Sequence, residues 1–210
     1  MDIKFYNVDG HYGNFSNFAP YPIFIDGKSW PTVEHYFQSS KFEDLLMRET
    51  IRSLSSPMKA AKTGRDRKLP LRADWENIKN DVMLQALLAK FKQHHILRSE
   101  LLSTNDAILI EHTENDVYWG DGGDGKGENM LGKLLMRVRE MIREINDDPH
   151  IVLPPWIAFS DIDSHDMFWR MGLGENYMYV WSRYYLNNEN KVKYQELFPE
   201  PTDWEGFYQY

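Results

Sequence analysis

Glu34, Gln38 and Lys41 have the residue types and the spacing to carry acid–base chemistry. They stand at positions i, i+4 and i+7 of segment 30–42, and residues at this spacing align on one face of a helix. Aromatic residues crowd the same segment, so a fully solvated stripe is unfavourable there. A partly buried Glu34 would have a raised pKa and suit proton transfer. The alternative is a solvent-exposed ion pair between Glu34 and Lys41.

A glycine-rich loop at residues 119–129 is the second candidate. It holds five glycines and three acidic residues, and glycine at this density usually lets a ligand approach the backbone. Gly120 to Lys126 fits the start of a phosphate-binding P-loop, but Gly127 replaces the Ser or Thr that holds magnesium, and the acids would repel phosphate. The spacing also fails that of a calcium loop. We therefore expect contacts to sugar hydroxyls or to a base, with a solvated turn as the alternative.

A basic segment at residues 59–72 offers a phosphate site. Six basic residues and one acidic residue span a predicted helix end and Gly64. Backbone donors there, the forked guanidinium of Arg65 and the ammonium of Lys62 could hold a phosphate together. The alternative is a solvated basic face.

A polar and aromatic turn at residues 12–18 is a weaker candidate for binding a base. Asn17 could pair with the edge of a base while Phe15 or Phe18 stacks on its face. The alternative is a loop whose phenylalanines anchor it in the core.

Metal and thiol chemistry have no support in the sequence. The chain contains no cysteine, which excludes disulfides, thiol catalysis and cysteine-based metal sites. The histidines are scattered without metal-ligand spacing, so we expect no metal site. No G-x-S-x-G segment supports a serine hydrolase.

Four helices and three short strands are expected to position these residues. The helices are predicted from Thr32 to about Leu54, from Ser56-Pro57 to Lys62, from Asp74 to about Gln93 and from Asn129 to about Ile145, and the strands at 3–8, 22–26 and 107–110. Apolar residues cover most faces of the third helix, which predicts that it is central and largely buried.

Charge and aromatic content change sharply along the chain. Residues 147–210 hold 11 acidic and 4 basic residues and half of the aromatic residues. We therefore predict a boundary near 146, with a domain at 1–146 and an acidic, aromatic-rich extension at 147–210. The extension is expected to pack on the core as a lid or flank, the alternative being a separate partner site. So acidic a chain argues against general electrostatic binding to nucleic acid.

No apolar run reaches membrane-spanning length, and no signal peptide opens the chain. We therefore expect a cytoplasmic protein with no membrane partner.

Taken together, the motifs resemble the NADAR superfamily, and especially its YbiA-like branch, over about residues 3–145. The resemblance is carried, in order, by Phe15-Ser16-Asn17-Phe18, Trp30 to Gln38 with Lys41-Phe42, Gly64-Arg65-Asp66-Arg67, and Trp119 to Gly123 with Asn129 and Leu131-Gly132. Each motif is modest alone, but the ordered set is specific. The last 64 residues have no counterpart in the short YbiA-like proteins.

The resemblance implies a predominantly helical α+β fold with a small antiparallel sheet, followed here by the aromatic-rich appendage. It also implies an N-glycosidase that needs no cofactor and cleaves the bond between a phosphorylated ribose and a nitrogenous base. The YbiA-like branch acts on aminopyrimidine ribose phosphates of early riboflavin synthesis. Other branches remove ADP-ribose from guanine in DNA or RNA, so a phosphoribosyl or ADP-ribosyl small molecule and ADP-ribosylated nucleic acid are both candidate substrates. A non-catalytic ADP-ribose or nucleotide binding module is the alternative, and the oligomeric state is open.

The same resemblance carries residues over to this chain. It makes Glu34 the essential carboxylate and places Arg65 near phosphate, with Trp30, Trp75, Trp119, Asp121 and Asn129 around the pocket. Cleavage builds positive charge on the sugar and negative charge on the leaving base, so a carboxylate and an acid are needed. We expect Glu34 to be the main acid/base and Asp121 to bind ribose or to assist. In a second hypothesis Lys41 attacks C1 of an opened ribose as an amine nucleophile while Glu34 shuttles protons.

Overall fold

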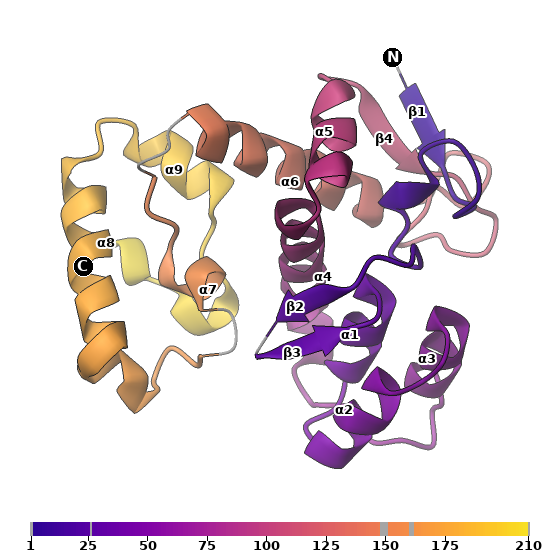
Figure 1. Ribbon diagram of the computed structural model, residues 1–210, viewed down its shortest axis with the longest axis horizontal. Helices are drawn as coiled ribbons and strands as arrows, with labels where there is room; N and C mark the ends of the chain where they lie inside the picture. The colour runs from indigo at the N-terminus through magenta and orange to yellow at the C-terminus, as the bar shows by residue number, and fades with distance from the viewer. Residues whose placement is uncertain (1, 26, 148–150, 160–161, 210) are drawn as a thin grey trace. The chain divides into compact units, whose positions relative to one another are not determined.

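The computed structural model describes residues 2–25, 27–147, 151–159 and 162–209 (Figure 1). The chain divides into two compact units, Met1–Arg139 and Glu140–Tyr210, called here the N-terminal and C-terminal units. Within the described residues no helix is both long enough and apolar enough to cross a membrane.

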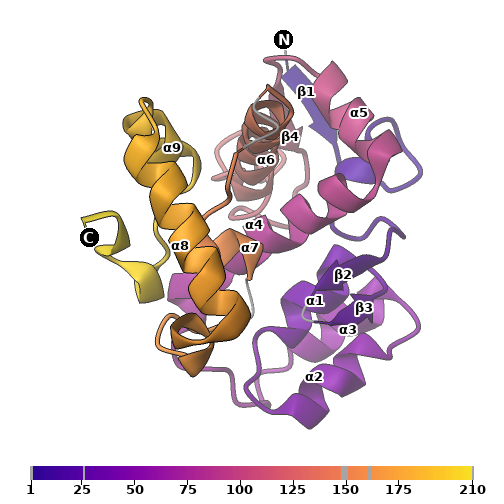
Figure 2. The same ribbon diagram turned by 60° about the vertical axis from the view of Figure 1, so that its left-hand side comes forward.

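Helices dominate the N-terminal unit. They are α1 (Val33–Ser39), α2 (Leu45–Arg52), α3 (Pro57–Gly64), α4 (Trp75–Gln93), α5 (His95–Ser103) and α6 (Met130–Asp147), which runs on past the boundary between the units. Figure 2 shows α1, α2 and α3 gathered beside one short hairpin, while α4 passes through the unit. Both α1 and α4 are largely buried, as expected for α4 from its apolar faces.

The single helix predicted from Thr32 to Leu54 is wrong, because the chain breaks between α1 and α2. Thr32 does cap α1, its hydroxyl accepting the N–H of His35. At the far end the Asp44 carboxylate accepts the N–H groups of Leu46 and Met47 and starts a new helix. Lys41 therefore lies in the turn after α1 rather than on the helix that carries Glu34.

Two separate two-stranded sheets complete this unit. β2 (Ile23–Ile25) pairs antiparallel with β3 (Lys28–Trp30), which confirms the small antiparallel sheet. β1 (Asp2–Phe5) pairs in parallel with β4 (Ile108–Glu111), and the register joins Phe5 to Glu111. Alternation along β4 turns Leu109 and Glu111 to the buried side.

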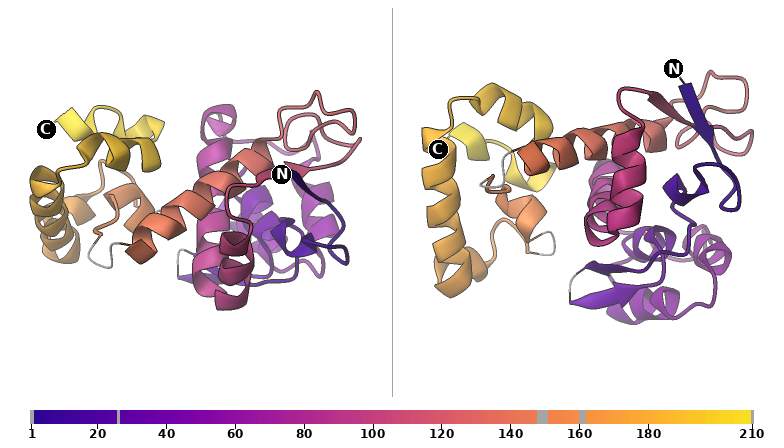
Figure 3. Two further views of the ribbon diagram at one scale, coloured as in Figure 1. Left: turned by 90° about the horizontal axis from the view of Figure 1, so that it is seen from above. Right: turned by 45° about the horizontal axis from the view of Figure 1, so that its top comes forward.

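Asn129 starts α6 but does not cap it as predicted with its side chain. Its Nδ2 donates to the carbonyl of Leu109 (2.8 Å) and its Oδ1 accepts the N–H of Glu111 (2.9 Å). Gly132 allows this close packing, because a Cβ there would stand 2.1 Å from the Leu109 carbonyl oxygen. The amide of Asn129 therefore attaches the start of α6 to β4. Figure 3 shows the loop that joins β4 to α6 extending from the end of β4.

The C-terminal unit contains α7 (Pro155–Ala158), α8 (Gly172–Asn187) and α9 (Lys191–Leu197) with short 3-10 turns between and after them. Trp156, Trp169 and Trp204 form its buried cluster, and Trp181 donates to the hydroxyl of Tyr194 (3.0 Å). The predicted aromatic-rich appendage is therefore confirmed as a packed unit. That it covers the N-terminal unit stays a prediction.

Candidate active site

A cavity of about 770 Å³ lies within the N-terminal unit. Its walls come from the segments after β1 and around residue 17, from α1 and the turns after α1 and α3, and from the end of β4 with the following loop. One residue each of α3, α4 and α6 completes them. The polar and charged lining residues include Asn17, Glu34, Gln38, Lys41, Arg65, Glu111, Asn115 and Asp116, and the aromatic ones Phe37 and Trp119. Segments distant in sequence thus bring carboxylates and cations into one cavity.

Glu34 lies in the first turn of α1 and is only 2 % exposed. Its Oε2 accepts a hydrogen bond from Asn17 and its Oε1 accepts one from Gln38 (2.7 Å). Burial raises the pKa of Glu34 to about 7, against the opposing effects of the Gln38 hydrogen bond and of the Arg65 and Lys41 charges. This carboxyl can therefore gain and lose a proton near neutral pH.

A buried ammonium fixes the segment that carries Asn17. Lys90 of α4 is fully buried and its Nζ donates to the carbonyls of Asn14 (2.5 Å) and Ser16 (2.9 Å). The Asn17 carbonyl in turn accepts the N–H of Glu34 (3.0 Å). The hydrogen-bond partner of Glu34 is therefore held by α4, whose only residue in the cavity wall is Met83.

Lys41 reaches the cavity from the turn after α1. Its Nζ donates to the carbonyl of Gly64 (3.2 Å) and stands 5.5 Å from the ring centre of Phe37 and 5.7 Å from that of Trp75. Burial lowers its pKa, while the charge of Glu34 acts in the opposite direction. A lowered pKa makes the neutral, nucleophilic amine more accessible.

The basic segment contributes one of its two predicted phosphate ligands to the cavity. Arg65 ends α3, is exposed and lines the cavity. Lys62 is exposed on α3 but is not part of the cavity wall. The guanidinium of Arg65 makes no hydrogen bond or ion pair within the described residues, so it is available to an anionic group.

Of the three tryptophans carried over from the family, only Trp119 lines the cavity. Phe37 packs edge-on against both Trp119 (5.3 Å between ring centres) and Trp75 (5.0 Å). Trp75 is buried behind this contact. Trp30 is also buried and donates to the carbonyl of Ile25 (3.2 Å). Trp30 and Trp75 therefore support the cavity wall from the core.

Asp121 is turned into the glycine-rich loop and is absent from the cavity wall. One oxygen meets His112 Nδ1 (2.7 Å), and the other accepts the N–H groups of Thr113 (3.2 Å) and Gly123 (2.9 Å). Burial acts to raise the pKa of Asp121, but the hydrogen bonds, led by that from His112, lower it overall. The glycines provide the positive φ angles that this turn needs, 77° at Gly123 and 80° at Gly125.

Asp121 is accordingly predicted to matter for stability. Asp121→Ala leaves the N–H groups of Thr113 and Gly123 without their acceptor, which should lower the free energy of unfolding by about 1–3 kcal/mol. Denaturant unfolding monitored by tryptophan fluorescence measures this. Asp124→Ala is the matched control: its carboxylate pairs with the ammonium of Lys126 and accepts the N–H of the same residue (3.0 Å). Because both contacts are exposed to solvent, the change should stay within about 0.5 kcal/mol. Equal effects of the two substitutions would contradict the structural role.

Two acids of the cavity were missed by the sequence analysis. Asp116 accepts the N–H groups of Tyr118 (2.9 Å) and Trp119 (2.7 Å) and so holds the backbone of Trp119. Glu111 is 9 % exposed, and its Oε2 is buried without a hydrogen-bond partner in the part of the chain that the structure describes. Burial, followed by the charges of Asp116, Glu34 and Asp121, raises its pKa to about 7. The sequence does hold one sign of Glu111: it is an acidic residue at a position of a short strand whose side chain faces the buried side.

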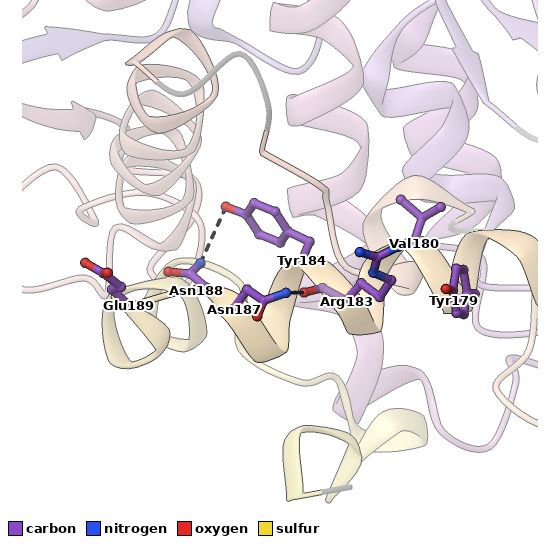
Figure 4. A pocket seen from close by; sticks show the side chains of 7 residues that line it. All are labelled: Tyr179, Val180, Arg183, Tyr184, Asn187, Asn188 and Glu189. Carbon is purple, nitrogen blue, oxygen red and sulfur yellow. Dashed lines mark hydrogen bonds between the residues drawn. The ribbon is translucent and has the colours of Figure 1, made fainter.

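A second cavity, of about 560 Å³, lies in the C-terminal unit (Figure 4). One face of α8 and the turn after it form its wall, which includes Arg183 and Glu189. Asn188 there donates to the hydroxyl of Tyr184 (3.4 Å), and Asn187 to the carbonyl of Arg183 (2.8 Å). None of the residues predicted for the site lines this second cavity, whereas Glu34 and Lys41 both line the first one.

The N-terminal part of the chain is similar in sequence to several known proteins. The chain is 61 % identical over 140 residues to N-glycosidase YbiA of Escherichia coli, which covers 67 % of this chain and 88 % of that protein. It is 43 % identical over 148 residues to N-glycosidase Npun_R5314 of Nostoc punctiforme, covering 69 % and 95 %. It is also 40 % identical over 142 residues to riboflavin biosynthesis protein VVA0006 of Vibrio vulnificus, covering 68 % and 39 %.

The solved structures give the same relationship at the level of the fold. The solution structure of Escherichia coli YbiA matches with a TM-score of 0.67 and 56 % identity, covering 72 % of this chain and 92 % of that one. The NADAR domain matches residues 4–143, the part of the chain that contains the whole cavity. The chain therefore belongs to the NADAR family, with an additional C-terminal unit.

Proposed function

We propose that this protein is an N-glycosidase that hydrolyses the bond between a phosphorylated ribose and a nitrogenous base. The observation that carries the proposal is the buried, proton-exchanging carboxyl of Glu34, which lines one cavity with Lys41 and Arg65. The names of the relatives, two N-glycosidases and a riboflavin biosynthesis protein, support the same activity. They also favour aminopyrimidine ribose phosphates of riboflavin synthesis as the substrates.

The proposed reaction assigns a task to each residue of the cavity wall. Glu34 takes the proton of the attacking water or stabilises the positive charge that develops at C1 of ribose. Asn17 and Gln38 hold its carboxyl in place through their amide donors. Trp119 offers a face for the base, and Arg65 binds the phosphate at the rim.

The ribose-binding task expected of Asp121 loses its support, because both of its oxygens are engaged within the loop. The other carried-over residues likewise have structural tasks. Trp30 and Trp75 pack in the core, and Asn129 attaches α6 to β4. Lys62 stands on the outer side of α3. We assign direct substrate contact to the residues of the cavity wall alone.

A side-by-side assay of base release tests the proposal. The substrates are an aminopyrimidine ribose phosphate, DNA or RNA carrying ADP-ribosylated guanine, and NAD. The expected result is fastest release from the aminopyrimidine ribose phosphate. Faster release from modified guanine would assign the protein instead to ADP-ribose removal from nucleic acid, and tight binding without release would make it a binding module. Either of these results would overturn the proposal as stated.

Arg65 should determine how strongly the phosphate of the substrate contributes to binding. Arg65→Ala is expected to lower kcat/KM about ten- to hundredfold, the loss of one charge-assisted hydrogen-bonded contact. The effect should appear mainly in KM and should vanish with the dephosphorylated substrate. Arg67→Ala, which removes an exposed neighbour outside the cavity wall, is the control. An equal loss with and without the phosphate would contradict the assignment.

A further inference from the structure

Glu111 combines a firmly held backbone with a carboxyl that is left without a partner. Its N–H donates to Asn129 Oδ1 (2.9 Å) and its carbonyl accepts the N–H of Asp121 (2.9 Å). The side chain is nine-tenths buried and lines the cavity, yet Oε2 has no hydrogen bond within the described residues. A buried polar atom without a partner is costly to the fold. Such an atom in a cavity wall is therefore available to a ligand.

The charges around Glu111 and Glu34 divide the two carboxyls into different roles. Burial is the largest effect that favours the protonated form of Glu111. The negative charges of Asp116 and Asp121 in the loop and of Glu34 in α1 act in the same direction. Burial and the charge of Asp116 favour the protonated form of Glu34 as well, but Glu34 also faces two cations, Lys41 beyond α1 and Arg65 beyond α3, which favour its ionised form. With one proton between them, Glu111 is the preferred acid and Glu34 the preferred carboxylate.

Resting on the N-glycosidase function proposed above, we propose that Glu111 is a second catalytic carboxyl, which protonates the leaving base. As the bond between C1 and the base nitrogen breaks, its electron pair goes to the base, and the proton of Glu111 goes with it. The oxygen of water forms the new bond to C1, and the water proton goes to Glu34. The step leaves Glu111 ionised and Glu34 protonated, and exchange with solvent restores both.

This assignment narrows the class of bases that the cavity serves. Aminopyrimidines and guanine leave as anions unless they are protonated, so they require the acid. An aryl leaving group that is already stable as an anion does not require it. Glu111 thus allows the enzyme to hydrolyse ribosides whose base is a poor leaving group.

The test compares Glu111→Gln with the wild-type protein on two leaving groups. On an aminopyrimidine ribose phosphate we expect kcat to fall about 10²–10⁴-fold. On 4-nitrophenyl ribofuranoside 5-phosphate, whose leaving group needs no proton, we expect less than about a tenfold loss. The high-pH decline of kcat/KM for the aminopyrimidine substrate should also disappear in the variant. Glu114→Gln is the matched control, an exposed acid in the loop after β4 and outside the cavity wall, and should leave both rates unchanged.

Three results would overturn the assignment: full activity of Glu111→Gln, equal losses on both leaving groups, or a retained high-pH decline. Circular dichroism and thermal unfolding establish that the variant is folded, and Glu111→Asp provides a second variant that keeps the acid. Partial recovery by Glu111→Asp supports the acid role. A wild-type protein that releases no base from any substrate would instead overturn the proposed function itself, which separates the two failures.

Discussion

Replacing Glu34 with Gln is expected to lower kcat for base release at least about 100-fold, and up to about 10⁴-fold, the usual contribution of a positioned acid or base. The carboxyl lies in the cavity wall and is oriented by hydrogen bonds from Asn17 and Gln38. The measurement is release of the base under saturating substrate. Glu43→Gln, an exposed acid just beyond α1, is the control and should retain full activity. Full hydrolysis by Glu34→Gln would exclude Glu34 as the acid/base.

In the same Glu34→Gln variant, the stability relative to the wild type should rise with pH, although the activity falls. The pKa of Glu34 is raised to about 7 in the folded protein from 4.5, so between these values the folded state binds more protons than the unfolded state. The stability of the wild-type protein is therefore reduced as pH rises through this window. Glu34→Gln removes this term, and its free energy of unfolding relative to the wild type should increase from pH 5 to pH 8. Denaturant unfolding at the two pH values measures the difference.

Replacing Lys41 with Ala gives the second large expected effect, a loss of at least about 100-fold in kcat/KM. Its ammonium is one of two cations that favour the ionised form of Glu34. It lies near the rings of both Phe37 and Trp75, and burial lowers its pKa. Loss of this charge raises the pKa of Glu34 further. The pH at which kcat/KM reaches half its maximum on the acid side should therefore shift upward in the variant. An active variant with an unshifted profile would contradict this role.

Lys41→Arg and borohydride trapping decide how Lys41 acts. If the lysine acts through its charge, Lys41→Arg keeps most of the activity and borohydride captures no adduct. If its amine attacks C1 of an opened ribose, Lys41→Arg is as inactive as Lys41→Ala, and borohydride fixes the sugar to Lys41. We expect the first result, because Glu34 and water suffice for hydrolysis. A trapped adduct at Lys41 would establish the second route.

Local sequence signals located four helix starts in the N-terminal unit, but they misjudged one break and missed α5. Thr32 and the Ser56-Pro57 pair begin their helices as predicted, because capping depends only on neighbouring residues. The predicted helix to Leu54 failed since Asp44 starts a new helix. Lys41 consequently lies in a turn, from which its ammonium reaches the carbonyl of Gly64 on another helix.

The site residues show what could not be predicted from the sequence motifs. Glu34, Lys41, Arg65, Asn17 and Trp119 meet in one cavity, whereas the family motif also carried residues whose side chains serve the architecture. A motif records that a residue type is needed and does not record the direction of its side chain. Asp121 follows Trp119 by two positions, yet it turns to His112 and the loop backbone. The glycines allow that turn, and the acid closes it.

The sequence by itself determined the residue types available for chemistry, the helices that begin at local caps, the absence of cysteine and the change to an acidic, aromatic-rich C-terminal part. Each of these depends on composition or on neighbours within a few positions. Only the tertiary structure decided that Glu111 shares a cavity with Glu34. The parallel pairing of β1 with β4 and the Asn129 bridge to α6 fix the direction of Glu111. Burial then raises its pKa, because a charge removed from water is stabilised only by the partners that the fold supplies.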